Sequence, residues 1–297
     1  MAVRRSMIKA PLDYAPADVR ARHRLVPGWF DDVDAAVFRW ILDWQSAHGV
    51  RGDLAELGVF QGKSAIVIGW HVCGSETFTV AELFGAPAGD AATESEVRTS
   101  YPGLDRSTFE DTYLLFHDRL PEVVEGPTTL LEGRLGSASH RFVHVDASHL
   151  YHHVVADLRL SERILRSGGV VACDDYRSEH TPGVAAAVWA EVAAGALVPL
   201  CLTPQKLYAT TGPAQGLADD LAEWLSRHDH LEMETHGTPA GPVIRIVQGM
   251  VEESPVRSLV RGWAPPRALT EALRLRDRMT VKRWGTASHR RADSAVS

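Results

Sequence analysis

The sequence has few cysteines and no long apolar run. Its three cysteines, Cys73, Cys173 and Cys201, lie far apart and form no C-x-x-C pair, which excludes a disulfide framework or a zinc knuckle and indicates a reducing compartment. No segment approaches the roughly 20 apolar residues of a membrane span, and the first residues have no signal-peptide apolar region. We therefore expect a soluble, cytoplasmic protein with no membrane partner.

The sequence also lacks a net positive charge. Its formal net charge is −7, and residues 251–297 contain ten Lys or Arg against five Asp or Glu, so the rest of the chain carries −7 − 5 = −12. Nucleic-acid binding needs a concentrated basic face, so the acidic body argues against a nucleic-acid partner. We expect the basic end to be a solvated helix or a contact to an acidic subunit surface.

Apolar segments alternate between strand-like and helix-like patterns. The chain of 297 residues is 45% hydrophobic, which is enough for a full core. Five apolar runs read as strands, and helical segments lie between most of them, while residues 85 to about 108 read as a loop or short helix. Alternation of this kind predicts an α/β fold with a doubly wound, Rossmann-like sheet. The strands are expected at 54–57, 77–84, 128–133, 141–146 and 168–176, with a terminal antiparallel hairpin in 197–211.

Three regions follow from this pattern. Residues 1–48 are a leader and a helix that could close as a lid, and residues 49–212 are the core. Residues 213–297 are a C-terminal extension with a helix at 217–228, a strand at 242–248 and a basic helix at 265–284 before a disordered end. The extension could form a lid, a dimer contact or an added subdomain, so a homo-oligomer is one possible assembly.

The first strand leads into the glycine motif E-x-G-x-x-x-G-x-S, formed by Glu56, Gly58, Gly62 and Ser64. The two glycines would let the backbone approach a ligand closely, although tight packing between strand and helix explains them equally well. The spacing is not the G-x-G-x-x-G of dinucleotide folds, which counts against NAD. Glu82 ends the second strand, where doubly wound folds bind ribose hydroxyls, but a strand-end acid is common.

Three aspartates, Asp146, Asp174 and Asp175, follow predicted strands at the edge where open α/β sheets bind ligands. Carboxylates that converge repel one another unless a cation or protons intervene. Oxygen ligands favour Mg²⁺, Mn²⁺ or Ca²⁺ over zinc. The alternative is that these side chains cap turns and bind backbone amides.

The stretches "VPGW", "ELGVFQGKS", "FVHVDASHLYHHVVADL", "GGVVACDDY", "PGV" and "KLY" resemble the class I S-adenosylmethionine-dependent methyltransferases of the macrocin O-methyltransferase type, over about residues 25–210. The resemblance implies that the loop with Glu56, Gly58, Gly62 and Ser64 holds the methionine part of the cofactor. It also implies that Glu82 binds the ribose and that Glu132 and Gly133 flank the adenine. Family members commonly have Gly-Asp after the third strand, whereas this chain has Gly133-Arg134.

The resemblance further implies that Asp146, Asp174 and Asp175 ligate Mg²⁺, or Mn²⁺. Catechol-type enzymes place a basic lysine three positions after the first ligand, and His149 stands there in this chain. A neutral imidazole at pH 7 could accept the proton of a substrate hydroxyl. Macrocin-type enzymes often carry a second acid at the position of Ser148, which leaves a histidine base or a loss of metal dependence open.

The other histidines have weaker assignments. His180 is the reserve candidate for the base, and His140 and His144 are expected to be structural. His152 and His153 are expected to be solvated or at the edge of the core.

The leading hypothesis is a Mg-dependent O-methyltransferase that uses S-adenosylmethionine on a hydroxyl of a small molecule, such as a sugar or a secondary metabolite. A metal-independent N- or O-methyltransferase is the first alternative. A non-catalytic cofactor-binding partner protein is another, and an NAD-dependent oxidoreductase is the weakest.

Overall fold

The computed structural model describes residues 14–101, 104–213, 215–228 and 231–248. The predicted basic helix at 265–284 and the disordered end lie outside these residues. Within them, no helix is both long and apolar enough to cross a membrane.

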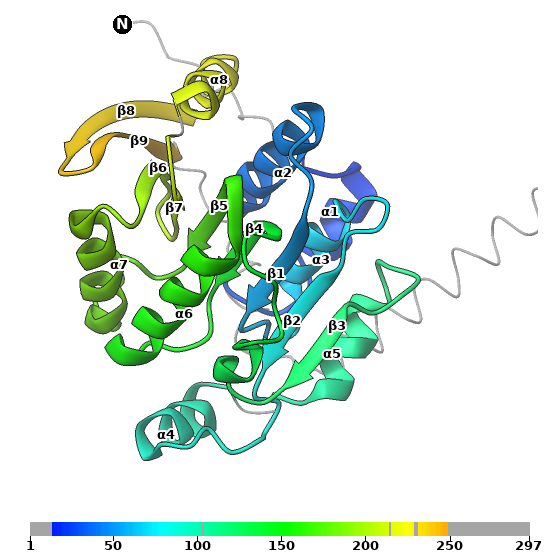
Figure 1. Ribbon diagram of the computed structural model, residues 1–297. Helices are drawn as coiled ribbons and strands as arrows, with labels where there is room; N and C mark the ends of the chain where they lie inside the picture. Colours follow the sequence, from blue (N-terminus) through cyan, green and yellow to red (C-terminus); the bar gives the residue numbers. More distant parts are fainter. Residues whose placement is uncertain (1–13, 102–103, 214, 229–230, 249–297) are drawn as a thin grey trace, which may run out of the picture.

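In the described part of the chain, nine strands form one sheet in the order β3-β2-β1-β4-β5-β7-β6-β9-β8 (Figure 1). The first five pair in parallel, β7 is antiparallel to both β5 and β6, and β9 pairs in parallel with β6 and antiparallel with β8. The α/β fold with its terminal antiparallel hairpin is therefore confirmed. The strands are β1 (Asp53–Leu57), β2 (Phe78–Glu82), β3 (Glu122–Glu125), β4 (His140–Val145), β5 (Leu165–Cys173), β6 (Val198–Leu202), β7 (Leu207–Thr210), β8 (Leu231–Thr238) and β9 (Gly241–Gln248).

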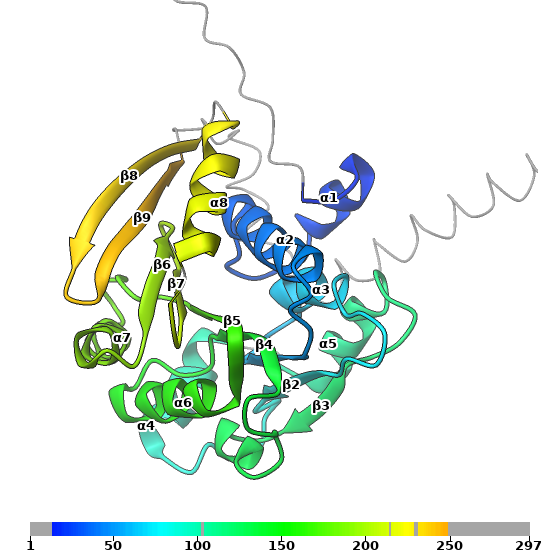
Figure 2. The same cartoon turned by 45° about the horizontal axis from the view of Figure 1, so that its top comes forward.

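Helices cover both faces of the sheet, and a hydrophobic cluster fills each interface (Figure 2). Successive strand residues point to opposite faces, so Leu54 joins one cluster and Ala55 the other. Helices α2, α3, α5 and α8 supply the first cluster, and α6 and α7 the second. The helices are α1 (Ala17–His23), α2 (Asp32–Ala47), α3 (Lys63–Gly69), α4 (Ala91–Ser100), α5 (Arg106–Tyr113), α6 (Tyr151–Ile164), α7 (Pro182–Ala194) and α8 (Gln215–Ser226).

The predicted third strand is wrong. Residues Thr128–Leu131 form a short 3₁₀-helix, η1, and the strand is Glu122–Glu125. This strand lies at the edge of the sheet and only Val124 is buried, so it lacks the continuous apolar run of an inner strand. The apolar pair Leu130 and Leu131 instead belongs to η1, in which Leu131 is buried.

The extension beyond residue 212 continues the sheet. Strand β9, which the sequence predicts, pairs with β6 through Cys201 opposite Ile244, and β8 completes a hairpin with it. Helix α8 packs on α2, with the rings of Trp40 and Trp224 5.8 Å apart. The described part of the extension therefore enlarges the core on the side away from β3.

Candidate active site

A cavity of about 760 Å³ lies at the carboxyl ends of the parallel strands. It is bounded by the leader loop at 27–30, the glycine loop at 58–60, helix α4, and the segments that follow β2, β3, β4 and β5. Its volume is in the range of small-molecule sites, and its position is the one expected for ligands of open α/β sheets.

The glycines of the loop are required by packing within the chain. Gly58 has φ +82°, and a Cβ there would lie 2.1 Å from the backbone oxygen of Asp146. Gly62 has φ +85°, and its Cβ would lie 3.0 Å from the ring of Phe109. Gly58 also lines the cavity, so the loop passes between β4 and the space for a ligand.

Glu82 holds this loop in place. Its carboxylate accepts hydrogen bonds from the backbone N–H groups of Val59 (2.9 Å), Phe60 (3.0 Å) and Leu83 (2.8 Å). The first two bonds brace the loop at Phe60, which has a left-handed φ of +46°. Glu82 lines the cavity as the sequence suggests, and lone pairs remain on its two oxygens.

Glu56 lies in the core and is not among the residues that line the cavity. Its carboxylate accepts a hydrogen bond from Ser64 and lies 2.6 Å from Nδ1 of His144. Burial raises the pKa of Glu56 to about 8, although the bond from Ser64 opposes this. The side chain of Glu56 thus faces His144, and its contact with the cofactor stays a prediction.

Glu132 and Gly133 are exposed and lie outside the cavity lining. Because the third strand ends earlier than predicted, the segment Gly126–Thr129 borders the cavity at that point. The adenine contacts of Glu132 and Gly133 stay a prediction, and Gly126–Thr129 is the segment that lines the cavity here. The missed signal is the Gly126-Pro127 pair, a turn sequence that directly follows the true strand.

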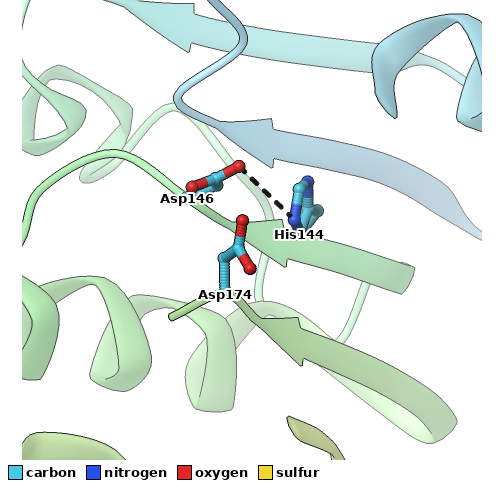
Figure 3. Close-up of side chains that lie close together, drawn as sticks. All are labelled: His144, Asp146 and Asp174. Atoms are coloured by element: carbon cyan, nitrogen blue, oxygen red, sulfur yellow. Dashed lines mark ion pairs between the residues drawn. The ribbon is translucent and has the colours of Figure 1, made fainter. Parts of the chain in front are cut away.

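The structure brings together two of the three aspartates. Asp146 and Asp174 lie beside His144, with one donor atom of each residue within 4.8 Å of the others (Figure 3). His144 Nε2 lies 3.9 Å from Asp146 Oδ2. Asp175 instead binds His149 and accepts a hydrogen bond from Ser178 at 2.6 Å.

A buried lysine, Lys206, which is not predicted from the sequence, lies beside His144, Asp146 and Asp174. Lys206 is fully buried, and its Nζ lies 2.7 Å from Asp174 Oδ2. It also lies 5.5 Å from the centre of the Phe30 ring. Burial and the charge of Asp174 raise the pKa of Asp146 well above its usual value. The pairing of Lys206 with Asp174 could have been predicted from the order of the strands. Lys206 directly precedes β7, Asp174 directly follows β5, and these two strands are antiparallel neighbours.

These residues fit a divalent ion. Two carboxylates and one imidazole present converging donors, and His144 Nε2 is a buried polar atom with no hydrogen-bond partner among the described residues. Asp175 is not part of this donor set.

His149 lies on the cavity wall between two acids. Its Nε2 is 3.2 Å from Asp175 Oδ2, and its Nδ1 is hydrogen-bonded to Glu96 of α4. Burial lowers the pKa of His149, but the hydrogen bonds to Asp175 and Glu96 outweigh it and raise the pKa to about 10. The expectation of a neutral imidazole at pH 7 is therefore corrected for this geometry. Its role as the base stays a prediction.

The remaining histidines differ in their access to the cavity. His180 is exposed and lines the cavity, with its ring 6.2 Å from that of His149. His153 also lines it and lies 3.6 Å from Asp90 at the start of α4. His152 is exposed, and His140 is buried at the opposite end of β4.

Three aromatic side chains that line the cavity contact one another. The ring of Trp29 lies 5.6 Å from that of Phe60 and 5.8 Å from that of Tyr101. Trp29 remains 65% exposed. The leader, the glycine loop and the end of α4 therefore meet at one rim.

Residues 55–176 match the model of a methyltransferase domain family. Among solved structures, the chain is similar to the O-methyltransferase NovP, with 20% identity over 66% of this chain and 88% of that one and a TM-score of 0.48. It is also similar to CalS11, a TDP-rhamnose 3′-O-methyltransferase of calicheamicin biosynthesis, with 16% identity over 67% and 96% of the two chains and a TM-score of 0.41. An O-methyltransferase from Bacillus cereus in complex with SAH shares 14% identity over 76% and 84%, with a TM-score of 0.35.

No curated protein matches the sequence significantly. The domain match spans β1 to the end of β5 and contains the glycine loop and all three aspartates. Residues 55–176 are therefore similar to a methyltransferase domain.

Proposed function

We propose that the protein transfers a methyl group to a hydroxyl of a small molecule and that the reaction needs a divalent ion. One observation carries the proposal: a single cavity is lined by the glycine loop, by Asp146 and Asp174, and by His149. A cofactor-binding loop, oxygen ligands and a proton-accepting side chain thus face the same space. A sugar or secondary metabolite with a ring is the class of acceptor we expect, since aromatic side chains line the cavity.

The cofactor would lie along the loop at 58–60 and reach the segment Gly126–Thr129. Glu82 borders the cavity between these two segments and keeps free lone pairs for ribose hydroxyls. The ion would be held by Asp146 and Asp174. When bound, the cofactor supplies an electrophilic methyl group and the ion lowers the pKa of a bound hydroxyl.

The role of His149 is to accept the proton of the acceptor hydroxyl. Glu96 fixes Nδ1, which leaves Nε2 as the atom that faces Asp175 and the cavity. We propose that an acceptor hydroxyl takes the place of Asp175 beside Nε2. Losing that carboxylate lowers the pKa of His149 and allows the ring to accept the proton.

The protein also aligns the reactants. Methyl transfer in one displacement requires donor and acceptor in line, and a preformed pocket supplies much of that alignment. The cavity walls come from five strand ends and two covering segments, and Glu82 fixes the glycine loop between them.

The test is thermal unfolding of the purified protein with S-adenosylhomocysteine, with NAD as the control, in Mg²⁺ or Mn²⁺ and then in chelator. A ligand selective for the folded state raises the midpoint. We expect a rise with S-adenosylhomocysteine and none with NAD, followed by metal-dependent methylation of a panel of hydroxylated compounds. Full turnover in chelator, or an N-methylated product, would reject the metal-dependent O-methyltransferase.

A further inference from the structure

We propose that the ion is bound by His144 together with Asp146 and Asp174, and that it is therefore a first-row transition metal ion such as Mn²⁺, Fe²⁺ or Co²⁺ instead of Mg²⁺. The inference rests on the proposed function for the need for an ion. Metal binding can be measured without cofactor or acceptor, so the two proposals can fail separately.

The first support is the state of His144. The side chain is fully buried, and its Nε2 has no hydrogen-bond partner among the described residues. An unpartnered buried nitrogen costs free energy unless something binds it. Figure 3 shows the ring facing Asp146 and Asp174 at the end of β4.

The second support is the group on the other side of the ring. Nδ1 lies 2.6 Å from Glu56 Oε1, and the edge of the ring packs on Phe38 with the ring centres 5.1 Å apart. In the tautomer in which Nδ1 donates to an ionised Glu56, Nε2 carries the free lone pair. A carboxylate behind a histidine is the usual arrangement for a metal ligand, because it fixes the tautomer and the direction of the lone pair.

The distances between the donor atoms agree with coordination. His144 Nε2 and Asp146 Oδ2 are 3.9 Å apart, and one donor atom from each of the three residues lies within 4.8 Å of the others. Metal bonds of about 2.0–2.2 Å place neighbouring ligand atoms roughly 3–4 Å apart. Only small movements would bring all three donors onto one ion.

The charges also favour a cation. Asp34, Asp146 and Asp174 act on the buried ammonium group of Lys206, whose one positive charge is paired with Asp174. Each ionised carboxylate has about four lone-pair sites, so Asp174 can hold both Lys206 and an ion. Asp175 is oriented away, toward His149 and Ser178.

The nitrogen ligand determines the class of ion. Mg²⁺ prefers oxygen ligands and keeps several waters, whereas imidazole suits the later divalent metals. A set of one nitrogen and two carboxylates, with remaining positions open toward the cavity, therefore selects a transition metal.

The test uses the full-length protein after chelation. Co²⁺ binding is followed by visible absorption, and Mn²⁺ and Mg²⁺ binding by calorimetry. We expect tighter binding of Co²⁺ and Mn²⁺ than of Mg²⁺, and a loss of Co²⁺ affinity of at least about tenfold in His144→Gln. The matched control is His140→Gln, because His140 is buried on the same strand with an unpartnered Nε2 but lies at the opposite end. That variant should bind Co²⁺ like the wild type.

A second measurement needs no variant of a buried residue. Pulsed electron paramagnetic resonance of the Mn²⁺-loaded wild type should detect a directly bonded nitrogen, and His149→Gln should keep that signal. No nitrogen coupling, equal Co²⁺ affinity in a folded His144→Gln, or preferred Mg²⁺ binding that is lost in Asp175→Asn would overturn the inference. Metal binding through His144 without S-adenosylhomocysteine binding would instead reject the proposed function alone.

Discussion

Two histidine clusters at the same edge of the sheet use the same kinds of residue in opposite ways. We call them the inner cluster (Glu56, His144, Asp146, Asp174 and Lys206) and the rim cluster (Glu96, His149 and Asp175). Burial and the charge of Lys206 lower the pKa of His144 well below its usual value. Burial also acts on His149, but hydrogen bonds to Asp175 and Glu96 raise its pKa to about 10.

The difference shows that a neighbouring carboxylate does not by itself set the charge of a histidine. His144 lies beside Glu56, whose own pKa is raised to about 8 by burial, so a shared proton satisfies that pair. Lys206 adds a fixed positive charge nearby. The rim acids Glu96 and Asp175 are partly exposed, and although burial raises the pKa of Asp175, the hydrogen bond from His149 holds that pKa below its usual value.

The largest expected effect concerns the rim histidine. His149→Gln removes the group that we expect to accept the proton, so the turnover number should fall by roughly 10²–10⁴-fold. Binding of S-adenosylhomocysteine, measured by calorimetry, should stay within about twofold. The control is His152→Gln, since His152 is exposed outside the cavity. Turnover of the His149 variant near the wild-type level would move the base to His180.

A substitution in the inner cluster should instead lower the free energy of unfolding. Lys206→Met leaves Asp174 buried without its partner, and breaking a buried pair in this way costs about 3–5 kcal/mol of unfolding free energy. Urea denaturation measures the change. Arg227→Met is the matched control, because Arg227 pairs with Glu223 at the surface and should change stability by less than about 1 kcal/mol. Similar losses in both variants would contradict the role assigned to Lys206.

Glu96→Gln tests whether the acids beside His149 keep it protonated, unlike His144. The change removes one of the acids that hold the proton on His149, so the pKa of His149 should fall and the rise of activity with pH should move to lower pH. The turnover number should fall by roughly tenfold, because a mispositioned ring loses only part of its function. A pH–rate profile measures both effects. Glu94→Gln, at an exposed position on the same helix, should leave the profile in place.

The sequence predicts Asp146 and Asp174 of the inner cluster and His149 and Asp175 of the rim cluster, but not the partners that each of them contacts. Asp146 and Asp174 are expected together because each follows an apolar parallel strand, and such ends share one edge. The direction of Glu56 is not predictable from the glycine motif, since the partner that draws it inward, His144, lies on another strand. Because His144 and Glu56 lie 88 residues apart in the sequence, no local pattern predicts their contact.

The rim is harder because it depends on helix α4. The stretch 91–100 has no apolar stripe, and its helix is fixed by the cap of Asp90 and by contacts with the segment after β4. Glu96 therefore reaches His149 through tertiary contacts that no local pattern reports. The raised pKa of His149 is not predictable for the same reason, since the second acid comes from a helix that the sequence does not specify.

The smallest effect tests the charge of His149 through the pH dependence of stability. Its pKa is raised on folding, so its bonds to Asp175 and Glu96 contribute fully below about pH 6.5, and the contribution is lost as pH rises through about 10. Because the side chain is partly exposed, screening reduces the effect to about 1–2 kcal/mol. The difference in unfolding free energy between wild type and His149→Gln should therefore shrink from pH 6.5 to pH 10. A difference that grows over this range would mean that the rim histidine is neutral, like His144, and would remove the contrast between the two clusters.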